Sequence, residues 1–147
     1  MKALSIRQPY AFAITVGTKN IENRDWPIKF RGPILIHAGK KEDADDVDGV
    51  LRQLAKEGNM PLPAIEKGYR NHRWLGAIVG AARLSDCVTK SDSPWFCGPY
   101  GFVLTERLWS NRVDCKGMLG LFDVPESVLF EVHCPPYVVM GVPSAQT

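Results

Sequence analysis

The feature that most constrains the fold is a change from helix-type to strand-type patterning at about residue 75. Before this point, aliphatic residues recur at i, i+3, i+4 and i+7 from Val47 to Leu54. They predict a helix over Glu42–Glu57, followed by a turn at Met60–Pro63 and a short helix to about Lys67. After it, runs that are apolar or alternate between apolar and polar residues predict strands. The predicted strands are Leu75–Leu84, Phe102–Trp109, Gly120–Val124 and Val128–His133.

The N-terminal part supplies the remaining elements. Lys2–Ile6 is a predicted short strand, and Ile34–Ile36 is a predicted buried strand. Between them, Pro9 and Gly17 mark the first residue and the end of a predicted helix. This order of elements is typical of an α+β fold with a curved, mostly antiparallel sheet or a small barrel. It argues against a doubly wound parallel sheet, in which strands and helices alternate along the chain.

The chain length predicts one domain spanning residues 1–147, because 147 residues is the size of a single ordinary globular domain. No internal repeat and no Gly/Ser linker divides the sequence. The apolar runs fall far short of the ~18 residues that a membrane span needs, and Arg7 interrupts the N-terminal apolar stretch. We therefore expect a cytoplasmic protein that has no membrane partner.

The four cysteines show no Cys-x-x-Cys spacing, and we expect them to be free, partly buried thiols in a reducing compartment. A metal site that includes His133 and Cys134 is the less favoured alternative. The sequence also lacks a phosphate-binding glycine loop, a Gly-x-Ser-x-Gly motif and a His-Glu-x-x-His motif. We therefore predict no bound metal and no cofactor.

The charges are unevenly distributed, although the formal net charge is only +2. This small total excludes a polybasic nucleic-acid coat. The first 40 residues nevertheless contain seven Lys or Arg residues and only two acids. Five acids at the start of the predicted second helix supply most of the compensating charge, and we interpret them as a solvated helix start. They are Glu42, Asp43, Asp45, Asp46 and Asp48.

Basic and aromatic residues are interleaved between Arg24 and Arg31, with Trp26, Lys29 and Phe30 between them. This pattern is typical of a surface that tracks phosphates and stacks on bases. The alternative is an exposed hairpin whose charges are simply solvated, and charge alone does not separate the two interpretations.

A Gly-x-Lys-x-x-Glu-x-Arg motif runs from Gly17 to Arg24, just after the first predicted helix. Together with four flanking and later segments it closely resembles the ASCH domains of the PUA-like superfamily, over Leu4 to about Val132. The four segments are Leu4–Tyr10, Arg31–Ala38, Gly76–Leu84 and Gly117–Pro125. The resemblance implies a small β-barrel flanked by helices, with the motif in the wall of a cleft. It also implies a ligand among nucleic acids and nucleosides.

The resemblance and the side-chain chemistry together give the motif residues candidate roles. Lys19 is a candidate to bind a phosphate or carbonyl oxygen or, if it is desolvated, to act as a base or nucleophile. Glu22 is a candidate to orient Lys19 or to accept a hydrogen bond from an exocyclic amine. The amidohydrolase-type members carry a threonine at the position of Glu22, which argues against transferring their mechanism. Arg24 is a candidate to bind a phosphate or carboxylate group with two parallel hydrogen bonds. A structural ion pair with Glu22 is the alternative, and the sequence does not separate the two.

Residues around the motif are further candidates. Arg7 and Gln8 lie at a strand-to-helix junction, where side chains and backbone N–H groups attract anions. Trp26 and Trp95 are candidates to stack on a base, although packing is the commoner role of a lone tryptophan. His37, at the end of an apolar strand, is interpreted as a hydrogen-bonded core histidine.

The leading functional hypothesis is binding of RNA, of another single-stranded nucleic acid, or of a modified nucleoside or nucleotide. The predicted ligand-binding residues are Arg7, Gln8, Lys19, Glu22, Arg24 and Trp26. The alternative is a small hydrolase, either an amidohydrolase acting on acetylated cytidine or a ribonuclease, in which Lys19 is the base or nucleophile and Glu22 orients it. A protein-interaction domain is a third possibility.

Overall fold

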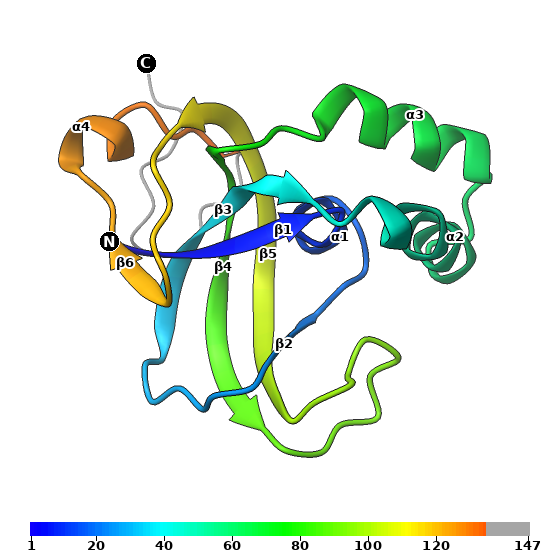
Figure 1. The fold of residues 1–147 in the computed structure, drawn as a ribbon, viewed down its shortest axis with the longest axis horizontal. Coiled ribbons are helices and arrows are strands. Elements are labelled where there is room, and N and C mark those ends of the chain that lie inside the picture. The colour runs from blue at the N-terminus through cyan, green and yellow to red at the C-terminus, as the bar shows by residue number, and fades with distance from the viewer. Residues whose placement is uncertain (135–147) are drawn as a thin grey trace.

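A computed structural model describes residues 1–134 of the chain. Its centre is a six-stranded sheet in the order β2-β5-β4-β3-β1-β6, with helices around it (Figure 1). The strands are β1 (Lys2–Gln8), β2 (Ile21–Arg24), β3 (Gly32–Glu42), β4 (Ala77–Val88), β5 (Tyr100–Asp114) and β6 (Leu121–Asp123). The helices are α1 (Tyr10–Thr15), the 3-10 turn η1 (Ala44–Asp46), α2 (Val47–Glu57), α3 (Leu62–His72) and α4 (Glu126–Leu129).

The sheet is curved and open, and β2 and β6 form its two edges (Figure 1). Neighbouring strands are antiparallel except for β1 and β3, which run parallel. Helices α2 and α3 lie together at one side of the sheet, and α4 lies near β6 at the other (Figure 1). The prediction of an α+β fold with a mostly antiparallel, curved sheet and flanking helices is confirmed.

Alternate residues of the central strands pack on opposite faces of the sheet. On β1, Leu4 and Ile6 join Ile34 of β3 in one buried cluster that also includes residues of α1. Ala3, on the other face of β1, joins Phe122 of β6 in a second cluster. A third cluster packs α1 against α2 and α3. The burial of both faces explains the continuous apolar runs at Ile34–Ile36 of β3 and Ala77–Ala82 of β4.

Gly17 allows α2 to pack against the end of α1. A Cβ atom at this position would lie 2.4 Å from Cδ2 of Leu54 and 2.9 Å from the carbonyl oxygen of Ala13. Because these distances are below van der Waals contact, a larger residue here would have to displace the Leu54 side chain or the backbone at Ala13. The close packing positions the Gly17–Arg24 segment that follows.

The predicted start of the second helix is wrong. Glu42 is the last residue of β3, and α2 begins only at Val47, after η1. The acids are also less solvated than predicted, because several bind residues from distant segments. Glu42 pairs with Arg73 at 3.0 Å and accepts a hydrogen bond from the Tyr69 hydroxyl.

The predicted strand at Val128–His133 is also wrong, because α4 occupies Glu126–Leu129. Pro125 precedes this helix, and its fixed φ angle suits a helix start. Val128 and Leu129 pack against the second buried cluster from this helix. The predicted third helix extends beyond Lys67, to His72.

No helix within residues 1–134 combines the length and the apolar character needed to cross a membrane.

Candidate functional site

A cleft of about 790 Å³ lies where β1, β2 and β3 meet the segment that joins β5 to β6. Its charged lining is strongly basic, with six basic side chains and two acidic ones. The basic residues are Arg7, Lys19, Arg24, Lys40, Lys41 and Lys116, and the acidic residues are Glu22 and Asp43. A chain with almost no net charge thus has a positively charged cleft, which favours an anionic ligand.

Lys19 lies in the wall of this cleft, and its ammonium group is buried within the protein. Its side chain is only 3% exposed, and Nζ donates a hydrogen bond to the carbonyl oxygen of Ile21 at 2.5 Å. Nζ also lies 5.4 Å from the ring centroid of Tyr10 and 5.5 Å from that of Trp95, within cation–π range. Burial lowers the pKa of Lys19, and the negative charge of Glu22 partly offsets that effect.

Glu22 connects Lys19 to Arg24. One carboxylate oxygen lies 3.7 Å from Nζ of Lys19, and the other lies 3.0 Å from Nη2 of Arg24 and accepts a hydrogen bond from its Nε at 3.2 Å. Nη2 of Arg24 donates a further hydrogen bond to the carbonyl oxygen of Ser5, which ties β2 to β1. The three charged residues of the motif therefore converge in one ion network, as the hypothesis requires.

Tyr10 and Arg7 complete this part of the wall. The Tyr10 hydroxyl donates a hydrogen bond to Asp46 at 2.5 Å, and burial together with this carboxylate raises the pKa of Tyr10. Arg7 is exposed and pairs with Asp43 at 3.1 Å. Both contacts join the first residues of the chain to the acidic segment after β3.

Gln8 and Trp26 are not brought to this cleft. The Gln8 side chain is fully buried, and its amide donates to the carbonyl oxygen of Trp74 and accepts from the backbone N–H of Phe12. Trp26 is half-buried and packs edge-on against Phe102, with 5.1 Å between the ring centroids. Trp95 is buried, and its Nε1 donates to Glu57 at 2.8 Å.

Several residues of the cleft were missed by the sequence reasoning. Lys40 and Lys41 lie near the end of β3, and a pair of adjacent lysines after an apolar run was an available signal. Lys116 belongs to the segment that joins β5 to β6. The same segment contributes Met118 and the fully exposed Leu119 to the cleft. Only the three-dimensional fold brings this segment to the motif, so the local sequence contains no indication of it.

Ser5 and His37 form a neutral pair at the floor of the cleft. Nε2 of His37 lies 2.7 Å from the carbonyl oxygen of Cys115, which can only accept, so this nitrogen carries the proton. Nδ1 is then free to accept from the Ser5 hydroxyl at 3.0 Å. Burial lowers the pKa of His37 and keeps the ring neutral. The prediction of a hydrogen-bonded core histidine is confirmed, although His37 also lines the cleft.

The four cysteines, which all lie within the described residues, form no disulfide; they are Cys87, Cys97, Cys115 and Cys134. Within residues 1–134, no three His, Cys, Asp or Glu side chains lie close enough together to hold a metal ion.

The ASCH domain model matches residues 4–113 of this chain. Among solved structures, a tyrosine-to-phenylalanine mutant of the ASCH protein from Zymomonas mobilis is similar, with a TM-score of 0.54 and 12% sequence identity; the match covers 89% of this chain and 97% of that one. The ASCH structure from the same organism has a TM-score of 0.49 and 14% identity, covering 86% of this chain and 89% of that one. At such low identity the likeness concerns the fold alone. No curated protein matches this chain.

Proposed function

This chain belongs to the ASCH domain family, and from that premise we propose that it binds single-stranded RNA, one or a few nucleotides at a time, in the basic cleft. ASCH domains are generally thought to bind RNA. The observation that carries the proposal for this chain is the convergence of Lys19, Glu22 and Arg24 in the wall of a cleft with six basic and two acidic side chains. A free nucleotide has the same chemistry and is the smaller alternative ligand.

The exposed lysines of the cleft are the proposed phosphate-binding groups. Lys40, Lys41 and Lys116 are exposed, and none of them forms an ion pair within residues 1–134. Their ammonium groups are therefore available to replace the counterions of a nucleic-acid backbone. Arg7 is less available, because it already pairs with Asp43.

The buried motif residues are the proposed base-recognition groups. Glu22 is held by Lys19 on one side and Arg24 on the other, and these contacts fix its orientation. A carboxylate accepts hydrogen bonds from an exocyclic amine such as N4 of cytosine. The Tyr10 ring, next to Lys19, and the exposed Met118 offer apolar surface for the base.

Fluorescence anisotropy with a short labelled single-stranded RNA tests this proposal. The double substitution K40A/K116A should weaken binding and reduce the slope of log K against log salt by roughly 0.7 for each phosphate that is no longer neutralised. The matched control is K56A/K67A, which removes the same charge from exposed positions of α2 and α3 outside the cleft. Absence of binding at low salt, or an equal decrease in affinity for both double variants, contradicts the proposal.

One observation favours hydrolysis as a second candidate function. The lowered pKa of Lys19 increases the fraction of neutral amine, the form that acts as a base or nucleophile. Binding remains our first choice, because the amine is enclosed and already donates to Ile21. Incubation of wild type and K19M with acetylated cytidine and with structured RNA tests for turnover, and equal rates in the two proteins exclude Lys19 as the catalyst.

A further inference from the structure

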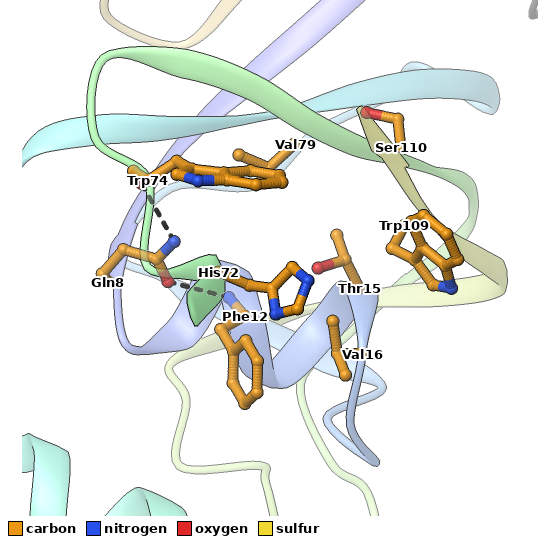
Figure 2. A pocket seen from close by; sticks show the side chains of 9 residues that line it. All are labelled: Gln8, Phe12, Thr15, Val16, His72, Trp74, Val79, Trp109 and Ser110. Carbon is orange, nitrogen blue, oxygen red and sulfur yellow. Dashed lines mark hydrogen bonds between the residues drawn. The ribbon is translucent and has the colours of Figure 1, made fainter. Parts of the chain in front are cut away.

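A second cavity, of about 200 Å³, lies between α1, the end of α3 and strands β4 and β5 (Figure 2). Among the described residues, none lines both this cavity and the basic cleft. Of the residues of β1, Gln8 lines this cavity, whereas Ser5, Ile6 and Arg7 line the cleft. A ligand of this cavity would therefore not compete directly with one in the cleft.

The walls of the second cavity are mainly aromatic. Trp74 and Trp109 lie on different sides of it, and the His72 ring lies between them in the view of Figure 2. Phe12 and Val79 contribute further apolar surface. The His72 and Trp74 rings are in edge-to-face contact, with centroids 5.4 Å apart. Flat aromatic walls of this kind suit a planar ligand ring, which can stack on the face of one aromatic side chain and make an edge-to-face contact with another.

The buried polar groups of the cavity are already used within the protein. Both ends of the Gln8 amide are hydrogen-bonded, at 3.1 Å to the carbonyl oxygen of Trp74 and at 2.9 Å from the N–H of Phe12. The Thr15 hydroxyl donates to Ala11 at 3.0 Å, and the Ser110 hydroxyl donates to Asn111 at 2.7 Å. Since no Asp, Glu, Lys or Arg within residues 1–134 lines the cavity, this part of the chain offers nothing to compensate a charged ligand there.

The His72 ring contributes a hydrogen-bond acceptor to the lining. Nδ1 of His72 lies 2.9 Å from the carbonyl oxygen of Gly68. A carbonyl oxygen can only accept, so Nδ1 carries the proton, and Nε2 of the neutral ring is a hydrogen-bond acceptor. The cavity thus combines aromatic walls with an imidazole acceptor.

We propose that this cavity is a second ligand site, which takes an uncharged bicyclic aromatic heterocycle with a ring N–H, the class that includes indoles and purines. The size agrees with this class: an apolar cavity of about 150 Å³ holds a benzene molecule, and this cavity is larger. The ring N–H donates to Nε2 of His72 while the ring faces contact Trp74 and Trp109. The site does not depend on the function proposed for the cleft.

Titration of ¹⁵N-labelled protein with indole at pH 8 tests the proposal. The chain has four tryptophans, and their side-chain N–H signals can be assigned by single Trp→Phe substitutions. The signals of Trp74 and Trp109 should shift in a saturable manner, while those of Trp26 and Trp95 stay in place. Equal shifts of all four signals overturn the proposal.

Two variants test the chemistry of the site. W109A, at a half-exposed position, should weaken indole binding about tenfold by removing one wall. Its matched control is F130A, which removes an exposed aromatic ring outside the cavity and should leave the affinity unchanged. Wild type should bind 1-methylindole about tenfold more weakly than indole, because the methyl group removes the ring N–H. H72F should abolish that difference. Equal effects of W109A and F130A, or an unchanged preference in H72F, contradict the assignment.

Guanosine, whose base keeps a ring N–H at N1, and a short guanine-containing RNA distinguish the two sources of such a ring. Saturable shifts of Trp74 and Trp109 with the RNA indicate that the cavity takes a base of a bound strand, whereas shifts with indole or guanosine alone indicate a free small molecule. Either result supports the site, and a failure of all three probes to give saturable shifts overturns it. RNA binding measured through K40A/K116A reports on the cleft separately.

Discussion

Replacing Glu22 by Gln should destabilise the protein more than replacing Lys19 by Met, although both substitutions break the same ion pair. The asymmetry follows from the network. Glu22 contacts two cations, Lys19 and Arg24, so K19M leaves it with Arg24 at 3.0 Å. Within residues 1–134, Lys19 pairs with no other acid, so E22Q leaves a buried ammonium group without a counter-charge.

The magnitude can be worked from the geometry. The side chains of Lys19 and Glu22 are 3% and 11% exposed, and their charges lie 3.7 Å apart. At an effective dielectric constant of about 20 this separation corresponds to roughly 4–5 kcal/mol of attraction, and breaking a buried pair usually costs about 3–5 kcal/mol. The interactions of Lys19 with the Ile21 carbonyl and two aromatic rings remain in E22Q and offset part of this cost. We expect E22Q to cost about 3 kcal/mol and K19M about 1–2 kcal/mol.

Urea unfolding of wild type, K19M, E22Q and K19M/E22Q measures these free energies. In the double variant the Lys19 ammonium group is gone, so the added cost of E22Q should fall well below its cost in the wild-type background. E106Q is the matched control: it breaks a 2.7 Å pair with Arg83 at a mostly exposed glutamate and should cost less than about 1 kcal/mol. The reasoning is refuted if K19M costs as much as E22Q, or if the two effects simply add.

Three further outcomes are expected. G80A should destabilise the protein by roughly 2–3 kcal/mol or more, since its Cβ would lie 2.3 Å from the Leu108 carbonyl oxygen. G49A, in α2 with no described atom within 4 Å of the new Cβ, should stabilise the protein by about 0.5–1 kcal/mol. Thermal unfolding that ranks the two variants in the opposite order would contradict both expectations. G117A would place a Cβ 2.5 Å from Cε1 of the buried His37, so it should displace the segment joining β5 to β6 and weaken RNA binding several-fold, whereas G49A binds normally. Burial lowers the pKa of His37 from its ordinary 6.5, so below about pH 6.5 the unfolded chain binds more protons than the folded one and stability falls as the pH drops. In urea titrations H37Q should therefore lose less stability than wild type between pH 7 and pH 5. An identical pH dependence of the two proteins would exclude His37 as the cause.

The sequence predicted the elements well where local patterning dominates and poorly where distant partners decide. The α2 helix was expected because its aliphatic residues follow the helical period, but its start was wrong. The segment from Glu42 to Asp46 is held by Arg7, Tyr10 and Arg73, which come from other parts of the chain. Dipole arguments about one helix contain no information on such interactions.

The candidate site was predicted in part, for similar reasons. The spacing of Lys19, Glu22 and Arg24 was sufficient to predict that their side chains lie together, because the three residues lie within one short turn and the edge strand that follows it. Gln8 was predicted to bind the ligand, but its side chain is buried between Trp74 and Phe12, to which both ends of its amide are hydrogen-bonded. Lys116 could not be found, since only the fold brings its segment to the cleft.

Because the motif is buried, we expect different residues to govern the affinity for RNA and the orientation of Glu22. Lys19 and Arg24 already bind Glu22 and backbone carbonyl oxygens, so they have little capacity left for a phosphate. Within the described residues, the exposed lysines at the rim form no such ion pairs. Substitutions at the rim should therefore change the salt dependence of binding while the stability stays close to that of wild type. Substitutions in the motif should change stability first, and binding only through the position of Glu22. We therefore propose that the charged motif is the scaffold of this cleft and that exposed lysines outside the motif are the groups that attract an anion.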